Sequence, residues 1–174
     1  MAKSNYFSPK LITQTPDDAE TDVPWVIGDH PAYSERDIVH TVNTTNGGIR
    51  NRTWYIHYTN FDFDNTVPNV ITGVEVILKT RRNGRVYDET VCLSHAIDPI
   101  TDNKTSYQSD GYDHYPVYDY MKYGGEGDLW GGPILLASRV KDEHFGVTFR
   151  FQGHPYTPHK CGMAIDSVQI CFYS

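Results

Sequence analysis

Three side chains near the end of the sequence, His154, His159 and Cys161, are of the types that bind zinc. A closed zinc site needs a further ligand and groups that hold the ligands in place. Cys161 also follows His159 too closely for zinc-finger spacing, and Pro155 and Pro158 favour a turn. We therefore predict a proline-rich turn without a metal. The other histidines are scattered and are predicted to be structural or exposed: His30, His40, His57, His95, His114 and His144.

Acidic pairs could bind calcium, which takes several oxygen ligands, or hydrolyse glycosides, which requires two carboxylates across a cleft. Asp62 with Asp64, and Asp110 with Asp113, are the candidate pairs for calcium, and no pair is singled out for glycoside hydrolysis. Residues 109–113 lack the full EF-hand pattern, which favours a solvated turn. The sequence also contains no GxSxG motif, P-loop or dinucleotide-binding motif. We therefore predict no enzyme, no catalytic residue and no cofactor.

Tyrosine is abundant, with 13 copies, and several lie in an irregular region between about residues 96 and 140. Loops of this length are usually functional or contain short strands of their own. Tyrosine rings have an apolar face that can stack on sugars, and they are enriched in protein interfaces. Four of them could bind a glycan or a neighbouring subunit, or could instead fold over the edge of the domain: Tyr112, Tyr115, Tyr118 and Tyr120.

The net charge of −7, from 22 acidic and 15 basic residues, disfavours a nucleic-acid partner, which needs clustered Lys and Arg. The densest basic run, residues 79–85, is predicted to be a solvated turn. Three cysteines cannot all pair within one chain, so reduced thiols made in a cytoplasm are expected. The N-terminus lacks the apolar stretch of a signal peptide, and no apolar run approaches membrane-spanning length, so no membrane partner is predicted.

Short segments in which apolar and polar residues alternate predict β-strands, and no segment keeps the apolar spacing of a helix. The predicted strands are residues 37–42, 52–59, 71–79, 85–94, 144–151 and 166–173. Strands with one apolar face cover a core on one side. The sequence therefore predicts an all-β fold, an antiparallel β-sandwich that is jelly-roll-like.

The alternation also predicts which side chains face the core. Val74, Val76 and Leu78 share one face of their strand, whereas Glu75 and Lys79 lie on the other. Asn83-Gly84 predicts a tight hairpin turn, because both residue types tolerate positive φ. The strand that follows this turn would place four residues on one face: Tyr87, Glu89, Val91 and Leu93.

Residues 1–24 are polar, contain three prolines and show no strand or helix periodicity. We predict an extended N-terminal arm, either free in solvent or ordered against a partner subunit. The sandwich domain would then cover residues 25–174.

Four segments resemble, in order, a β-sandwich family of tailed-bacteriophage virion proteins, which includes tail-fibre and minor structural proteins. They are NFDFDNTVPNVITGVEVIL (60–78), YGGEGDLWGG (123–132), LASRVKDEHFGVTFRF (136–151) and IDSVQICFYS (165–174). The resemblance covers roughly residues 25–174. The sequence departs from the family pattern at its last four residues and in the loop from Asp98 to His114.

The resemblance implies a structural accessory protein on the head or in the tail of a virion, assembled in the host cytoplasm. Its partners would be capsid or tail subunits and further copies of itself, with a trimer as the first expectation. The alternative is a carbohydrate-binding or host-adhesion module that binds a surface glycan through the tyrosine-rich loop.

Trp130, beside glycines in the DLWGG segment, is predicted to plug the end of the sandwich, and Asp166 to cap a turn before the last strand. Residues predicted to have structural roles are Trp54, Trp130, Phe145, Val147, Phe149, Val168 and Ile170.

Overall fold

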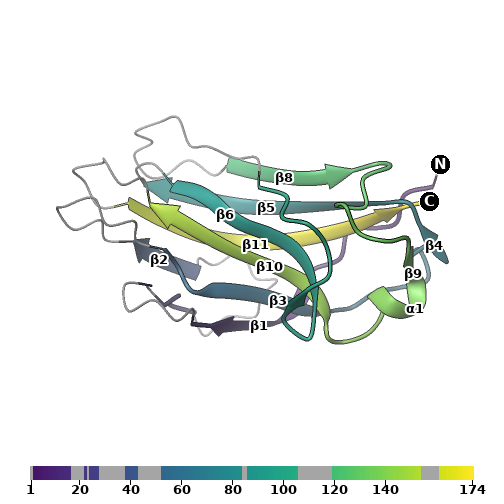
Figure 1. Ribbon diagram of the computed structural model, residues 1–174, viewed down its shortest axis with the longest axis horizontal. Helices are drawn as coiled ribbons and strands as arrows, with labels where there is room; N and C mark the ends of the chain where they lie inside the picture. Colours follow the sequence, from purple (N-terminus) through teal and green to yellow (C-terminus); the bar gives the residue numbers. More distant parts are fainter. Residues whose placement is uncertain are drawn as a thin grey trace.

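The computed structural model describes residues 2–16, 22, 24–27, 38–42, 52–83, 86–105, 119–153 and 161–174, with the backbone alone at 38–42, 82–83 and 161–162. Within these ranges two antiparallel sheets pack against each other, and a short two-stranded ribbon lies at one end (Figure 1). The predicted all-β sandwich is therefore confirmed.

The first sheet, called the β10 sheet, contains in spatial order β1 (Pro9–Thr15), β3 (Tyr55–Phe61), β10 (Phe145–Gly153), β6 (Val86–His95) and β7 (Asp98–Pro99). The second, called the β11 sheet, contains β2 (Ile38–Val42), β11 (Cys161–Tyr173), β5 (Gly73–Asn83) and β8 (Asp119–Gly125). The ribbon pairs β4 (Val70–Ile71) with β9 (Leu135–Leu136), which leads into the four-residue helix α1 (Ala137–Val140). No helix in the described ranges is long and apolar enough to cross a membrane.

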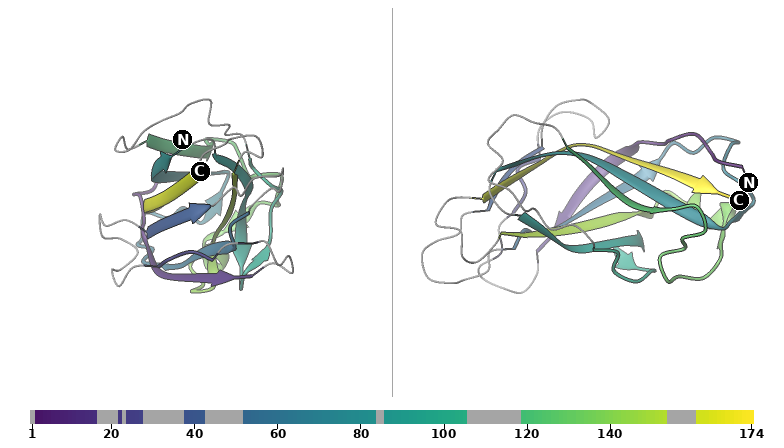
Figure 2. Two further views of the ribbon diagram at one scale, coloured as in Figure 1. Left: turned by 90° about the vertical axis from the view of Figure 1, so that its left-hand side faces the viewer. Right: turned by 90° about the horizontal axis from the view of Figure 1, so that it is seen from above.

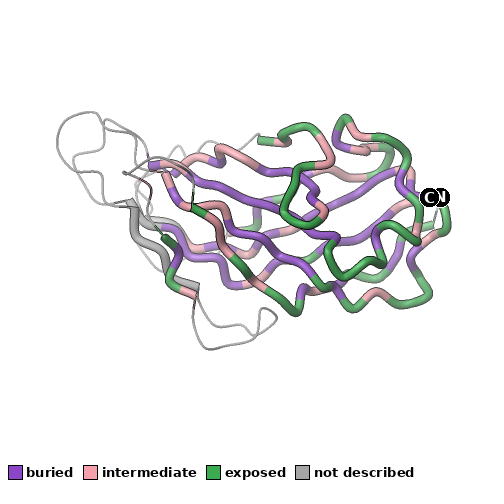
Figure 3. The backbone as a smooth tube through the Cα atoms, turned by 60° about the horizontal axis from the view of Figure 1, so that its bottom comes forward, coloured by how far each residue is buried: buried purple, intermediate pink, exposed green. Residues whose placement is uncertain are grey.

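The core lies between the sheets, and the strands that line it are buried along much of their length (Figure 3). The four apolar residues of β10 are fully buried, as are Val168, Ile170 and Phe172 of β11. The rings of Phe145 and Phe172 meet across the core at 6.2 Å between centroids. Val74, Val76 and Leu78 of β5 are also fully buried and on one face, as the alternation predicts.

Trp130 is completely buried next to β5. Its indole Nε1 donates a hydrogen bond of 3.0 Å to the backbone oxygen of Val74, and its backbone amide donates one of 2.9 Å to the Asp128 carboxylate. Gly124 has a φ of +71°, and a side chain there would collide with the Val74 carbonyl and the Trp130 indole. The glycines of this segment thus let the chain turn tightly around the indole.

Two β-bulges change the side-chain alternation that the sequence predicts. On β11, Ile165 faces Thr80 and Ser167 faces Lys79, so Asp166 is an extra residue within the strand. Asp166 therefore does not cap a turn before the strand, contrary to the prediction. Its carboxylate lies 2.8 Å from the Lys79 ammonium, which makes Lys79 part of a paired strand and not of a solvated turn.

The second bulge lies on β6, where Arg150 of β10 faces Thr90 and Phe151 faces Asp88. Glu89 is therefore the extra residue. Because of it, Val86 and Val91 are both buried although they are an odd number of residues apart. The predicted single face for Tyr87, Glu89, Val91 and Leu93 is wrong, since Glu89 instead bonds to Arg150.

The predicted hairpin at Asn83-Gly84 is also wrong. β5 ends at Asn83 and β6 begins at Val86, but the two strands belong to different sheets and do not pair. The chain crosses from the β11 sheet to the β10 sheet at this point. Gly84 itself lies outside the described residues. The partner of each strand is decided by the packing of the sheets.

The first residues of the chain pack against both sheets and do not form a separate arm, in contrast to the prediction. Lys3 and Phe7 bridge to the second half of β11, beyond the part that pairs with β2. The chain then changes sheets, and β1 pairs with β3 along residues 9–15 (Figure 2). A strand that switches sheets in this way closes one side of a sandwich.

Phe7 is the side chain that fixes this N-terminal segment. It is buried against Phe63, at 5.0 Å between ring centroids, and lies near Phe172. We expect Phe7→Ala to lower the free energy of unfolding by about 3 kcal/mol, because it leaves a cavity in the core. Chemical denaturation measures this change. The control Leu11→Ala, at a half-exposed position of β1, should cost less than about 1 kcal/mol, and equal effects would contradict the burial of Phe7.

Candidate functional site

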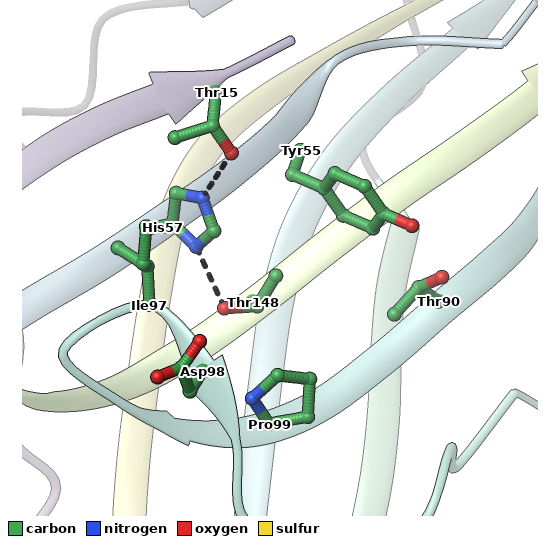
Figure 4. A pocket seen from close by; sticks show the side chains of 8 residues that line it. All are labelled: Thr15, Tyr55, His57, Thr90, Ile97, Asp98, Pro99 and Thr148. Carbon is green, nitrogen blue, oxygen red and sulfur yellow. Dashed lines mark hydrogen bonds between the residues drawn. The ribbon is translucent and has the colours of Figure 1, made fainter. Parts of the chain in front are cut away.

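A cavity of about 300 Å³ opens on the outer face of the β10 sheet (Figure 4). Tyr55 and His57 of β3 reach it because the intervening Ile56 points into the core. Thr148 of β10 lies beside His57 in the adjacent strand. The other lining residues come from β1, β6, β7 and the turn between β6 and β7: Thr15, Thr90, Ile97, Asp98 and Pro99.

His57 forms the floor of the cavity and joins three strands. One ring nitrogen lies 2.8 Å from the hydroxyl of Thr15 on β1, and the other 2.8 Å from that of Thr148 on β10. The Thr148 hydroxyl is in turn hydrogen-bonded to Ser94 on β6, at 2.9 Å. A neutral imidazole has one donor and one acceptor nitrogen, which suits two hydroxyl partners.

The imidazole is held in its neutral form. Burial lowers the pKa of His57, because the charged form would lose its hydration without gaining a carboxylate partner. Both ring nitrogens are already bonded within the domain. His57 therefore supports the cavity and is poorly placed to take a proton from a ligand.

Tyr55 is held at one side of the cavity by a buried arginine. Arg150 donates a hydrogen bond of 2.9 Å to the Tyr55 hydroxyl, and its guanidinium lies 4.7 Å from the centre of that ring. Arg150 is itself paired with Asp22, at 2.7 Å, and with Glu89, at 3.1 Å. Because the Tyr55 oxygen accepts from Arg150, its own proton can be donated to a ligand.

The opposite side of the cavity is the tight turn between β6 and β7. Ala96 and Ile97 both have positive φ, at 50° and 70°, although Asn and Gly are the usual residues there. A β-branched residue is strained in this conformation. The turn leaves Ile97 exposed at the rim and places Asp98 and Pro99 beside it.

A second polar cluster, centred on Glu75, lies on the outer face of the β11 sheet. The Glu75 side chain is 1% exposed and lies 2.5 Å from the Lys122 ammonium and 3.3 Å from that of Lys3. It also accepts hydrogen bonds from the hydroxyls of Tyr6 and Tyr173. Burial alone would raise the pKa of Glu75, but these four donors outweigh it and lower the pKa to about 2. This cluster attaches the N-terminal segment to the sheet.

The tyrosines singled out by the sequence are only partly placed. Tyr120, in β8, is 65% exposed. Tyr112, Tyr115 and Tyr118 lie outside the described residues. Of the residues with predicted structural roles, Trp54 packs partly buried against the core, and the others are buried in it: Trp130, Phe145, Val147, Phe149, Val168 and Ile170.

The two carboxylates of the described acidic pair, Asp62 and Asp64, have separate partners within the domain. Asp62 forms an ion pair with Lys10 at 2.9 Å, whereas Asp64 accepts hydrogen bonds from Thr66 and Asn5. Among the described residues there is no group of three or more potential metal ligands. Asp110, Asp113, His154 and His159 lie outside these ranges, and the side chain of Cys161 is not described. Cys92 and Cys171 are buried free thiols.

Sequence reasoning missed both polar clusters. The signal for the cavity is weak but present, since Tyr55, His57, Thr148 and Arg150 fall on the polar faces of two predicted strands. Glu75 was expected on an outer face, but its burial there depends on the N-terminal segment that covers it. Lys3 and Glu75 are 72 residues apart in the sequence, so no local pattern indicates that they are in contact.

No family model, curated protein or solved structure matches this chain.

We expect the neutral state of His57 to make stability depend on pH. The unfolded histidine binds a proton below about its ordinary pKa of 6.5, whereas the folded one resists protonation. Stability should therefore be complete above this pH and fall as the pH drops toward the lowered folded pKa. Denaturation of wild type and His57→Gln between pH 5 and pH 8 measures the difference. The exposed control His144→Gln should keep the wild-type profile, and a pH-independent difference between wild type and His57→Gln would contradict the burial of a neutral imidazole.

The Glu75 cluster predicts a stability loss in acid. Glu75→Gln removes the charge that two lysines and two tyrosines surround, so the free energy of unfolding should drop by about 3 kcal/mol at neutral pH. In wild type this contribution is present above the ordinary pKa of 4.5 and is lost as the pH falls toward about 2. Urea denaturation at neutral and acid pH measures both effects. Glu126→Gln, at an exposed site, is the matched control and should be neutral.

Proposed function

We propose that the protein is a structural accessory subunit of a tailed-phage virion, on the head or in the tail, that acts through contacts between subunits. The four ordered segments that resemble virion β-sandwich proteins support this proposal. The main support from the structure is an exposed apolar patch on the β4–β9 ribbon.

The ribbon patch consists of Val70, Ile134 and Leu136. Val70 and Leu136 are directly opposite each other in the ribbon, so their side chains share a face. They are 49% and 53% exposed, and Ile134, two residues before Leu136, is 63% exposed. Their neighbours Ile71 and Leu135 are buried in the core and hold the ribbon in place. Apolar side chains that gather on a fixed surface favour a protein partner.

The partner we propose for the ribbon patch is a further copy of this chain. The patch lies at one end of an elongated sandwich, close to both termini (Figure 1), where copies can meet around a common axis. Around such an axis each copy presents the same side chains to its neighbours. Because the side chains of the ribbon patch are uncharged, identical copies do not repel each other there. The described residues of the N-terminal segment pair with strands of their own sandwich, so they are not free to dock on another subunit.

The rigidity of the sandwich is consistent with a structural role. The charges of Glu75 and Arg150, on the outer faces of the two sheets, are paired within the domain. These pairs join strands that are distant in the sequence and also bind the first residues of the chain. Glycan binding is the second candidate function, and the cavity beside His57 is the observation that favours it.

Oligomeric state tests the structural role. We expect purified wild type to form a homo-oligomer, with a trimer as the first expectation, in light scattering coupled to size-exclusion chromatography. Leu136→Asp should shift it to monomers, because a carboxylate in an apolar contact loses its hydration. The control Leu11→Asp, also at a half-exposed leucine, should leave the oligomer intact.

A monomeric wild type at all concentrations, or equal effects of both variants, would contradict self-association through the ribbon patch. Mass spectrometry of purified virions then tests the wider proposal. Hundreds of copies per particle indicate the head shell and about a dozen indicate the tail, whereas absence from the particle refutes a virion subunit.

A further inference from the structure

We propose that the cavity beside His57 binds one uncharged sugar ring in its pyranose form, either a free sugar or the end residue of a glycan. This goes beyond a role in subunit contacts, since no residue of the ribbon patch lines the cavity. The inference rests on the size of the cavity, the groups that line it and the charges around it.

The size suits a single ring. Cavities for small ligands range upward from about 300 Å³, and this cavity lies at that lower limit. Its floor is rigid, because the hydrogen bonds of His57 tie β1, β3 and β10 together. A preformed site of this kind loses little conformational entropy when a ligand enters.

The polar groups match the hydroxyls of a sugar. Tyr55 can donate its proton while its oxygen stays bonded to Arg150. The carboxylate of Asp98 makes no hydrogen bond or ion pair within the described part of the chain, so it is free to accept from hydroxyl groups. Thr90 adds a hydroxyl that can do either. Figure 4 shows the Tyr55 ring and Asp98 on different sides of the cavity.

The apolar groups match the C–H face of a pyranose. Ile97 and Pro99 contribute aliphatic surface to the lining, and Tyr55 contributes an aromatic ring. Ile97 is 46% exposed and is held there in a strained conformation. The cavity thus combines an exposed aliphatic surface with polar groups that can bond to hydroxyls. Such a site binds a ring that has both apolar and polar faces better than it binds a purely apolar ring.

The charges exclude an anionic ligand. Among the described residues, Asp98 is the one charged side chain that lines the cavity. Arg150, behind Tyr55, is neutralised by Asp22 and Glu89. His57 is neutral, and the whole chain has a net charge of −7. A phosphate or a sialic acid would therefore be repelled, whereas a neutral hexose would not.

The test is titration with methyl glycosides of glucose, galactose, mannose and N-acetylglucosamine, with sialic acid as the anionic comparison. Binding is followed by amide chemical shifts in NMR spectra at millimolar ligand. We expect at least one neutral glycoside to bind and to shift amides of β3 and of the β6–β7 turn. Tyr55→Phe and Asp98→Asn should each weaken it about tenfold, because the first removes a hydrogen-bond donor to the ligand and the second replaces a charged acceptor by a weaker neutral one.

Two matched controls locate the site. Tyr87→Phe changes a half-buried tyrosine of β6 that does not line the cavity, and Asp102→Asn an exposed aspartate outside it. Both should keep wild-type affinity, and thermal unfolding should show that all four variants are folded. Lack of binding by every neutral glycoside, tighter binding of sialic acid, or loss of binding in Tyr87→Phe with none in Tyr55→Phe would each overturn the proposal. None of these results depends on the oligomeric state, so the proposed function is tested separately.

Discussion

Backbone hydrogen bonds along both edges of β11 hold the sandwich together. One edge pairs with β5 from Gly162 to Tyr173, across the Asp166 bulge. The other edge pairs first with β2 and then with the opening residues of the chain, where Phe7 and Ile170 exchange two hydrogen bonds. The inward side chains of this strand then fill the core, and its outward face receives the Glu75 cluster. β2 covers only the first half of this edge of β11. The N-terminal segment pairs with the second half, and in this way it closes the sandwich.

Charged groups on the outer faces of the sheets are unusually well shielded. A surface ion pair contributes little to stability, because water screens it and the side chains lose entropy. Glu75 and Arg150 differ, since their side chains are almost fully buried, with Lys3 and Tyr6 against Glu75 and Asp22 against Arg150. Burying such charges has a desolvation cost, which is offset only when several donors or acceptors surround each one. Each cluster therefore specifies one position of the covering segment.

Period-two alternation in the sequence was sufficient to predict the sandwich and the buried faces of β5, β10 and the second half of β11. It failed on β6, where the extra residue Glu89 shifts the alternation, because a bulge changes which side chains face the core without a local sequence signal. The bulge at Asp166 has no such signal either, and it is why the turn cap predicted there is wrong. It failed at Asn83-Gly84 because a turn signal does not state whether the next strand stays in the same sheet. The cavity could not be predicted, since His57 meets Thr15 and Thr148 only after three strands are aligned.

The cavity and the ribbon patch make different physical demands, and the fold meets them in different ways. A subunit contact needs apolar area that is fixed in place, and the buried Ile71 and Leu135 provide this beneath the exposed side chains of the ribbon. A sugar site needs polar groups whose directions are fixed before the ligand arrives. The hydroxyl groups of a free sugar are already hydrogen-bonded to water, so binding is favourable only if the protein does not also have to order its own groups. The pairing of Arg150 with Asp22 and Glu89 fixes Tyr55, and the strained turn fixes Ile97 and Asp98. Strain in a turn that packs no core is hard to explain by stability alone, which is why the position of Ile97 favours a binding role for this side of the sheet.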